Sequence, residues 1–377
     1  MKGDRSRSSH SPILSCPSRN AAHLAATMDI HFIDPTRDER WEQFLQAHPD
    51  ASLFHSSAWL KALYTTYGFQ PLLLTTAGPS EPITNGTPFC RIHSWMTGSR
   101  LVSVPFSDHC QPLSDPQEAV GATSEFLSRL LEWEHCNHVE LRPIGADVSW
   151  LRQTGFAQSA TFIHHTLDLR PPLSVLLDRM HKSCFQRKIR RAERECLTYA
   201  EGSSDELLQQ FYSLQIVTRR RHGVPPPPMT WFRNLRHFLG DTFKIGVASR
   251  NGRPIASIVT VRYKGTLVYK YGGSDIAFHQ FGSMPFLFWE TIQRAKTAGA
   301  AQLDLGRSDV CQAGLIAFKD HMGATATPIK YYRYPESAAN RSRLGAFMQR
   351  PEISAVSARL PSILFRAASN ILYRHMA

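Results

Sequence analysis

The segment Asp304-Leu305-Gly306-Arg307-Ser308 places charged and hydroxyl groups where a predicted strand ends. In open α/β sheets, ligands bind preferentially outside the carboxyl ends of the strands. Asp304, Arg307 and Ser308 are therefore candidates to contact a substrate. A structural ion pair between Asp304 and Arg307 explains the same residues equally well.

A second polar turn, Tyr269-Lys270-Tyr271-Gly272-Gly273-Ser274-Asp275, ends a predicted strand of alternating aromatic residues. Paired glycines permit a β-bulge or a splayed strand end, and either would open a cleft beside the sheet. Tyr271, Ser274 and Asp275 are therefore candidate substrate contacts. A simple hairpin exit is the alternative interpretation.

Between a predicted strand and a predicted helix lies the segment Gln280-Phe281-Gly282-Ser283-Met284-Pro285. The first N–H groups of a helix bind anions, and a glycine lets the anion approach the backbone closely. Gly282 and Ser283 are therefore candidates to bind a phosphate group of a cofactor. An ordinary helix start, capped by Ser283 with Pro285 in the first turn, is the alternative.

In the first half of the chain, Asp108 and His109 leave a predicted strand as neighbours. Adjacent side chains of an extended segment point to opposite faces, so these two are not expected to form an acid–base pair. They are interpreted as substrate-binding residues of a recognition loop. The paired histidines His135/His138 and His164/His165 lack further ligands at metal-binding spacing, so no metal site is expected.

The densest positive charge lies in a predicted helix that follows His181. Helical spacing puts four residues on one apolar stripe: Phe185, Ile189, Ala192 and Cys196. Other positions carry cations that would bind a nucleic-acid backbone or another anion: Lys182, Arg187, Lys188, Arg191 and Arg194. A solvated helix face is the alternative interpretation.

Composition limits the class of protein. The chain has 377 residues, 42% of them hydrophobic, and a net charge of +12 that suits an anionic partner. Arg219 and Arg220, at the end of a predicted helix, add to this charge as candidate substrate contacts, although they also suit the helix dipole. Seven widely spaced cysteines without a CxxC pair indicate a reducing cytoplasm. No apolar run reaches the ~20 residues that span a bilayer.

The order of predicted elements repeats along the chain, as β-β-β-α-β-α-β in each half. The length also favours more than one domain, since single cores rarely exceed about 250–300 residues. We therefore expect an α/β fold with mixed sheets and two tandem domains, divided as follows. The expected parts are a disordered extension (1–27), an N-terminal domain (28–170), a C-terminal domain (171–335) with a helical insert (172–223), and a basic helical tail (336–377).

Several motifs, taken in order, resemble the FemAB-like branch of the GNAT acyltransferase superfamily, and most of all the FemAB-related proteins of exopolysaccharide gene clusters. They are Phe54-His55-Ser56-Ser57-Ala58-Trp59, Pro105-Phe106-Ser107-Asp108-His109, His181-Lys182-Ser183, Arg219-Arg220-Arg221-His222-Gly223, Tyr271-Gly272-Gly273-Ser274-Asp275, Asp304-Leu305-Gly306-Arg307-Ser308 and Phe318-Lys319. The resemblance implies two GNAT-like modules side by side. It also implies acyl or aminoacyl transfer to an amine or hydroxyl of a cell-envelope or polysaccharide precursor.

In this resemblance Lys319 polarises the acyl carbonyl without a metal, and Asp304 is the second candidate catalytic residue. No tightly bound cofactor is expected. The co-substrate would be acyl-CoA or aminoacyl-tRNA. Because the sequence lacks the long coiled-coil arm of some tRNA-using members, the donor stays open, and so do tRNA as a partner and the oligomeric state.

Two other functions fit the same residues. One is a non-catalytic protein that binds nucleic acid or an anionic membrane, with the basic tail in peripheral contact with the membrane. The other is a pseudoenzyme scaffold in polysaccharide assembly.

Overall fold

The structure is a computed structural model that describes residues 30–113, 124–145, 151, 154–338, 365, 369 and 372–375. The predicted extension 1–27 and most of the predicted tail 336–377 lie outside the described residues. So does most of the short helix predicted near 147–154. No helix among the described residues is long and apolar enough to cross a membrane.

The N-terminal half contains ten described elements from β1 to β6. They are β1 (His31–Ile33), α2 (Glu39–Ala47), η1 (Leu53–His55), α3 (Ser57–Tyr67), β2 (Gln70–Thr75), β3 (Thr87–Ile92), β4 (Arg100–Val102), α5 (Ser124–Trp133), β5 (His138–Leu141) and β6 (Ala157–Asp168).

The C-terminal half begins with a helical region that carries the first of its strands. This region holds α7 (Leu173–Arg179), the π-helical turn η2 (Lys182–Gln186), α8 (Arg187–Arg194), β7 (Thr198–Gly202), α9 (Asp205–Arg221), α10 (Met229–Leu239) and η3 (Gly240–Thr242). The remaining elements are β8 (Phe243–Arg250), β9 (Arg253–Tyr263), β10 (Thr266–Ser274), η4 (Ile276–Phe281), α11 (Ser283–Thr297), β11 (Gln302–Asp309), α12 (Ala313–His321), β12 (Thr325–Tyr334) and η5 (Glu336–Ala338).

The two halves pair their strands in the same way. In the N-terminal half, β1, β2, β3 and β4 are antiparallel neighbours, and β4 runs parallel to β5. In the C-terminal half, β7, β8, β9 and β10 repeat this pattern, and β10 runs parallel to β11. The predicted repeat and the mixed α/β class are therefore confirmed.

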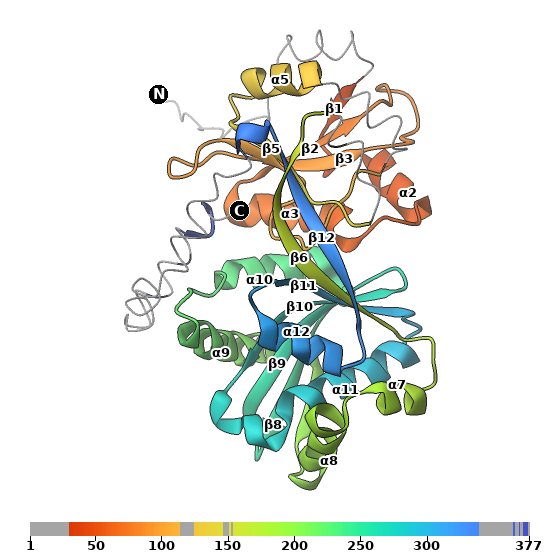
Figure 1. Cartoon of the computed structure of the whole chain (residues 1–377), viewed down its shortest axis with the longest axis vertical. Coiled ribbons are helices and arrows are strands. Elements are labelled where there is room, and N and C mark those ends of the chain that lie inside the picture. The colour runs from red at the N-terminus through yellow and green to blue at the C-terminus, as the bar shows by residue number, and fades with distance from the viewer. Residues whose placement is uncertain are drawn as a thin grey trace, which may run out of the picture.

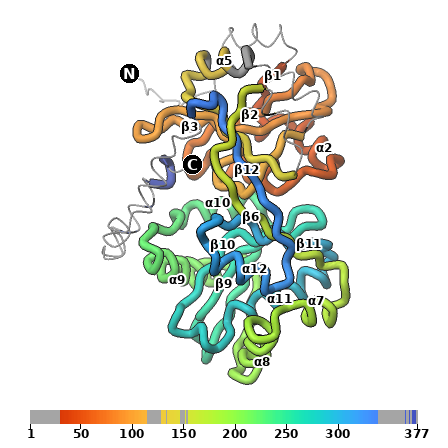
Figure 2. Tube along the Cα trace, in the orientation of Figure 1, coloured from red at the N-terminus to blue at the C-terminus, as the bar shows by residue number. Residues whose placement is uncertain are grey.

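The last strand of each half lies in the sheet of the other half. The order in the 12-stranded sheet is β1-β2-β3-β4-β5-β12-β6-β11-β10-β9-β8-β7. β12, from the end of the chain, pairs with β5, whereas β6 pairs with β11, and β6 and β12 pair with each other. These two long strands run side by side between the upper and lower parts of the molecule (Figures 1 and 2). The halves are therefore joined by exchanged strands and not only by a linker.

A shared hydrophobic core also joins the halves. Trp59 of α3 meets Trp231 of α10 edge to face, with ring centroids 5.3 Å apart, and both side chains are fully buried. The C-terminal strand β12 contributes in turn to the core of the N-terminal half, where Tyr332 packs with Leu101 and Val139. Each half thus buries apolar surface supplied by the other.

The predicted helical insert 172–223 is not helical throughout. β7 lies within it as the edge strand, paired with β8. The insert therefore supplies one strand of the repeat as well as helices. α10 was not predicted either, although its buried residues Trp231, Phe232, Leu235 and Leu239 recur at helical spacing.

Replacing Tyr332 by Ala should destabilise the protein by about 3 kcal/mol, because a large side chain is removed from a buried core. The change is in the C-terminal half, but the cavity opens in the core of the N-terminal half. Denaturant unfolding followed by tryptophan fluorescence measures the free energy. Lys330→Ala, on an exposed residue of the same strand, is the control and should stay within about 0.5 kcal/mol. A loss below about 1 kcal/mol for Tyr332→Ala would contradict the exchanged-strand packing.

Candidate active site where two parallel strands part

The sheet opens where β10 and β11 stop pairing. Their parallel register ends at Val268 and Asp304. Just beyond, β10 has a bulge against β9 at Lys270, because Tyr269 and Tyr271 pair with consecutive residues of β9. The bulge turns the two tyrosines to opposite sides of the sheet. Tyr269 joins the core of the C-terminal half, and Tyr271 joins the core shared by both halves.

A cavity of about 540 Å³ lies at this parting and reaches Tyr269 of β10 and Leu305 of β11. Its volume is within the range of small-molecule sites. Part of its wall is basic and comes from five residues: Lys188, Arg221, His279, Lys319 and His321. The apolar part includes Tyr269, Met284, Phe288, Leu305, Leu315 and Phe318.

Lys319, the predicted carbonyl-polarising residue, lines this cavity. It is 2% exposed, and its Nζ donates a hydrogen bond to the carbonyl oxygen of Gly306 at 2.9 Å. Burial lowers the pKa of Lys319 to about 8. The amine therefore stays mostly protonated at pH 7 and offers a fixed positive charge to a ligand in the cavity.

The predicted anion site at the start of α11 lies in the same cavity. Gly282 has φ of +77°, and a side chain there would collide with the backbone of Lys188, so glycine is required. Ser283 lines the cavity, is 1% exposed, and its Oγ has no hydrogen-bond partner among the described residues. A buried hydroxyl without a partner is costly, so this position suits a polar ligand atom.

Asp304 is buried and held by residues of the N-terminal half. Its carboxylate accepts from His164 Nε2 at 2.8 Å and lies 3.4 Å from His109 Nε2. Burial alone would raise the pKa of Asp304, but His164 and His109 outweigh it and hold the pKa well below the usual range. In the same way, Asp304 outweighs burial and raises the pKa of His164. The alternative interpretation, an ion pair between Asp304 and Arg307, is wrong, because Arg307 lies beside Asp108 instead.

Asp304 is also connected to Lys319 through the backbone of one residue, Gly306. The backbone N–H of Gly306 donates to Asp304 Oδ1 at 2.7 Å, and the carbonyl of the same residue accepts from Lys319. Gly306 has φ of +67°, and a side chain there would meet the carboxylate of Asp108 at 3.0 Å. The conformation of this glycine thus links the buried acid to the amine in the cavity.

Asp108 lies behind the cavity in a second buried ion pair. Lys270 Nζ is 2.7 Å from its Oδ2, and Arg307 Nε is 3.9 Å from its Oδ1. Burial would raise the pKa of Asp108, but Lys270 outweighs it, and the pKa is lowered. Asp108 and His109 bind different partners, as the alternation of an extended segment predicted. Lys270 was missed, because its contact depends on the bulge.

The loop that carries Asp108 and His109 is backbone-strained. Val104 and Phe106 have φ of +87° and +57°, which is unfavourable for a β-branched and for a bulky residue. Arg142 holds the loop, donating to the carbonyl of Val104 at 2.9 Å. Strain of this kind persists where the surroundings fix the conformation, and it concentrates at functional sites.

Several predicted site residues lie outside the cavity. Tyr271 is in the shared core, where its hydroxyl accepts from Trp231 at 2.8 Å. Asp275 caps η4 and pairs with Arg253 at 3.1 Å. Ser274 bonds His279, which does line the cavity, at 2.8 Å.

The predicted arginines of α9, Arg219 and Arg220, do not line the cavity, whereas the next residue, Arg221, does. Arg220 stacks on Phe365 at 5.4 Å, whereas Arg221 lines the cavity. Arg219 is half-buried and is not among the residues that line the cavity. Ser308, the predicted site residue of β11, is 1% exposed, and its Oγ has no hydrogen-bond partner among the described residues. The sequence shows a run of three arginines, Arg219 to Arg221, but the run alone does not indicate which of them faces a ligand.

The basic helix α8 packs as predicted on one side. Phe185, Ile189 and Ala192 are buried, but Cys196 is exposed, because it lies in the turn beyond the helix with φ of +52°. Lys188 lines the cavity, and Arg191 pairs with Glu195 at 2.7 Å.

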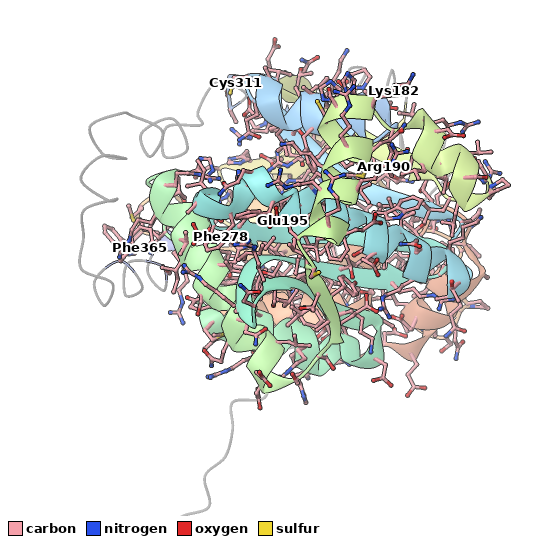
Figure 3. The ribbon with its side chains drawn as sticks, turned by 90° about the horizontal axis from the view of Figure 1, so that it is seen from below. Lys182, Arg190, Glu195, Phe278, Cys311 and Phe365 are labelled. Carbon is pink, nitrogen blue, oxygen red and sulfur yellow. The ribbon has the colours of Figure 1, made fainter. Side chains whose placement is uncertain are left out.

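Other cations of this region are exposed, and within the described residues no ion pair joins them: Lys182, Arg187, Arg190 and Arg194. Figure 3, seen from the end that carries α8, shows Lys182 and Arg190 on the segment that runs beside α12, at whose start Cys311 is labelled.

In the part of the chain that the structure describes, two groups bring metal-type ligand atoms within 4.8 Å of one another: His109, His164 and Asp304, and His181, Cys184 and His321. The expectation of no metal site rested on sequence spacing, which cannot find either group. In the first group, Asp304 already accepts hydrogen bonds from His164 and Gly306. The second lies at the cavity wall and has ligand types that Zn²⁺ accepts.

Replacing Asp304 by Asn should destabilise the protein by about 3–5 kcal/mol at pH 6, because it breaks a buried charged pair. The raised pKa of His164 stabilises the fold fully below about pH 6.5, and this contribution is lost as pH rises through the folded pKa. The difference between wild type and Asp304→Asn should therefore shrink from pH 6 to pH 9 in denaturant titrations. Asp168→Asn, in an exposed ion pair with Arg170, is the control and should change little. A difference independent of pH would contradict this role of His164.

Comparison with known proteins agrees with this architecture. Residues 181–319 match the family model Acetyltransf_6, an acetyltransferase (GNAT) domain. A UDP-N-acetylmuramoylpentapeptide-lysine N(6)-alanyltransferase of Weissella viridescens is 29% identical over 175 residues, 45% of this chain and 51% of that protein. The match thus spans about half the length of this curated relative.

Solved structures show the same fold at low sequence identity. FemX has a TM-score of 0.63 and 14% identity, with 78% of this chain and 95% of that chain covered. L-PGS from Bacillus licheniformis has a TM-score of 0.53 and 14% identity, with 87% and 98% covered. A tandem GNAT protein from the clavulanic acid pathway has a TM-score of 0.52 and 9% identity, with 81% and 98% covered. Residues 181–319 thus resemble a GNAT acetyltransferase domain, and the chain shares the fold of FemX and of a tandem GNAT protein.

Proposed function

We propose that the chain is an acyltransferase that moves an acyl group from a phosphate-bearing carrier to an amine or hydroxyl of a cell-envelope or polysaccharide precursor. The observation that carries this proposal is the position of Lys319. Its buried amine and the N-terminus of α11 line the same cavity of about 540 Å³. One can stabilise charge on a carbonyl oxygen, and the other can bind a phosphate.

The proposed step is a nucleophilic acyl transfer. The lone pair of the acceptor adds to the carbonyl carbon, and negative charge develops on the carbonyl oxygen near the protonated Nζ of Lys319. Collapse of the tetrahedral adduct breaks the bond to the carrier and leaves the acyl group on the acceptor. The proton of the acceptor passes to the departing thiolate or alkoxide, so the reaction needs only donor and acceptor.

Asp304 is proposed to be a positioning residue. It lies outside the cavity lining and acts through Gly306, whose N–H it accepts at 2.7 Å and whose carbonyl holds Lys319 at 2.9 Å. A fixed ammonium stabilises the transition state better than a mobile one, because no reorganisation is needed during the reaction. Arg307, with a side chain 31% exposed beside Asp108, is proposed as an acceptor contact.

The partners are proposed on the same basis. The relative from Weissella viridescens acts on the lysine of a UDP-N-acetylmuramoyl pentapeptide, so a related amine is the first acceptor to test. The exposed cations Lys182, Arg187, Arg190 and Arg194 would hold the phosphates of the carrier or a tRNA backbone. The free cysteines among the described residues fit a reducing cytoplasm, where such donors are made.

Lys319→Met should lower kcat by about 10²–10³-fold, because it removes the charge that stabilises the oxyanion and keeps the bulk of the side chain. Mass spectrometry of UDP-N-acetylmuramoyl pentapeptide, incubated with CoA thioesters or alanyl-tRNA and the full chain, measures the acylated product. Lys330→Met, on an exposed lysine, is the matched control. An unchanged rate for Lys319→Met would remove the carbonyl role, and no acylated product with either donor would count against this donor–acceptor assignment.

Activity should also fall as pH rises through about 8, because the lowered pKa of Lys319 leaves the amine neutral above that value. The lowered pKa means that the cation is fully present only below about pH 7. Single-turnover rates from pH 6 to pH 10 measure this dependence. Lys319→Arg, which stays charged over this range, should lose the alkaline fall even if its rate is lower. A wild-type rate that rises steadily to pH 10 would exclude the protonated amine as the active form.

A further inference from the structure

We propose that the group transferred by this chain is an uncharged, apolar acyl chain, and not an aminoacyl group. This inference rests on the proposed acyltransferase function and names the class of its donor. It follows from the charge and the polarity of the cavity beside Lys319. An aminoacyl ester carries an ammonium group next to its carbonyl, whereas a simple acyl thioester carries no charge there.

The cavity wall is basic. Its ionisable side chains are Lys188, Arg221, His279, Lys319 and His321, together with the thiol of Cys184 and the phenol of Tyr269, and no Asp or Glu is among the described residues that line it. The protonated Nζ of Lys319 must lie near the carbonyl that it polarises. An ammonium on the adjacent carbon would therefore meet a like charge in a partly buried site, where repulsion is strong.

The two acids that act electrostatically on Lys319, Asp304 and Asp108, are already paired. Asp304 is bonded to His164, and Asp108 to Lys270. On the outer side, Asp320 accepts from His165 at 3.1 Å.

The acid of η4 is engaged as well. Asp275 caps this turn and pairs with Arg253 at 3.1 Å. Each of these four carboxylates is thus held by a group outside the cavity lining, and none is placed to bind the ammonium of an amino acid.

The rest of the wall suits hydrocarbon. Tyr269 and Phe288 meet edge to face at 5.0 Å, and Phe288 contacts Phe318 at 5.7 Å. Met284 and Leu305 complete this surface. An alkyl chain gains free energy there by leaving water, whereas an ammonium would lose its hydration without a partner. The cations Lys188 and Arg221 then serve the phosphates of the carrier.

The test compares two CoA thioesters, of which one carries an ammonium group on its acyl chain, one carbon farther from the carbonyl than in an α-aminoacyl group, and the other carries none. Butyryl-CoA and β-alanyl-CoA have acyl groups of equal length, and the second carries an ammonium in place of the terminal methyl. Calorimetric titration of the full chain should give a Kd for butyryl-CoA that is about tenfold or more lower. Octanoyl-CoA should bind at least as tightly as butyryl-CoA, because a longer alkyl chain can bury more apolar surface.

Two variants at Met284 show whether the positive charge of the cavity wall causes the difference in Kd between the two thioesters. Met284→Glu adds an acid in the first turn of α11, where the helix dipole tolerates it, and Met284→Gln is the neutral control. The ratio of the two Kd values should fall about fivefold or more in Met284→Glu and stay unchanged in Met284→Gln.

Each outcome decides a separate point. Equal affinities, or tighter binding of β-alanyl-CoA, would overturn the inference and leave acyl transfer by Lys319 standing. An unchanged ratio in Met284→Glu would overturn the electrostatic cause. Binding of neither thioester, with transfer from alanyl-tRNA in the assay above, would overturn the inference while supporting the broader function.

Discussion

A buried carboxylate stays ionised only if other groups compensate for the water that it has lost. At Asp304 this compensation crosses between the two halves of the chain, because His164 and His109 both come from the N-terminal half. The same carboxylate fixes Gly306, and Gly306 fixes Lys319. The geometry of the cavity wall thus depends on the N-terminal half, although most of the wall belongs to the C-terminal half. A substitution at His164 or His109 would therefore be expected to change the position of the Lys319 amine.

Because the two halves pair their strands in the same way, equivalent residues can be compared, and they differ at one buried acid. Val102 of β4 pairs with Glu140, just as Val268 of β10 pairs with Asp304, so the two acids occupy equivalent positions. The carboxylate of Glu140 accepts hydrogen bonds from Arg142 and Arg333, both at 2.8 Å. These arginines outweigh the effect of burial and lower the pKa of Glu140 to about 2. Asp304 has histidines instead, and its neighbour Gly306 leads to the cavity. One copy of the module thus pairs its buried acid with two arginines, and the other uses its buried acid to fix the position of the Lys319 amine.

Local patterns in the sequence sufficed for the repeat and for the element order, because both depend on periodicity and turn residues. They also placed Lys319 and Ser283 on elements that line the cavity. Pairing over long distances could not be predicted: Asp304 takes partners 140 and 195 positions away, whereas the sequence suggested Arg307, three positions on. Tyr271 was predicted to contact the substrate, but after the bulge at Lys270 it is Tyr269 that lines the cavity, and Tyr271 lies in the shared core. β7 was missed because its residues are polar and half-exposed, without the apolar alternation of an inner strand.

The exchanged strands β6 and β12 affect how this protein can be made and how it can evolve. During translation, β5 leaves the ribosome long before β12, its neighbour in the sheet, has been synthesised. The first module therefore keeps the edge strand β5 without this partner until β12 has been synthesised, and open edges promote association with other nascent chains. If one module were transferred to another gene alone, its sheet would lack the strand that the other module supplies. The exchanged strands therefore favour keeping both modules in one gene.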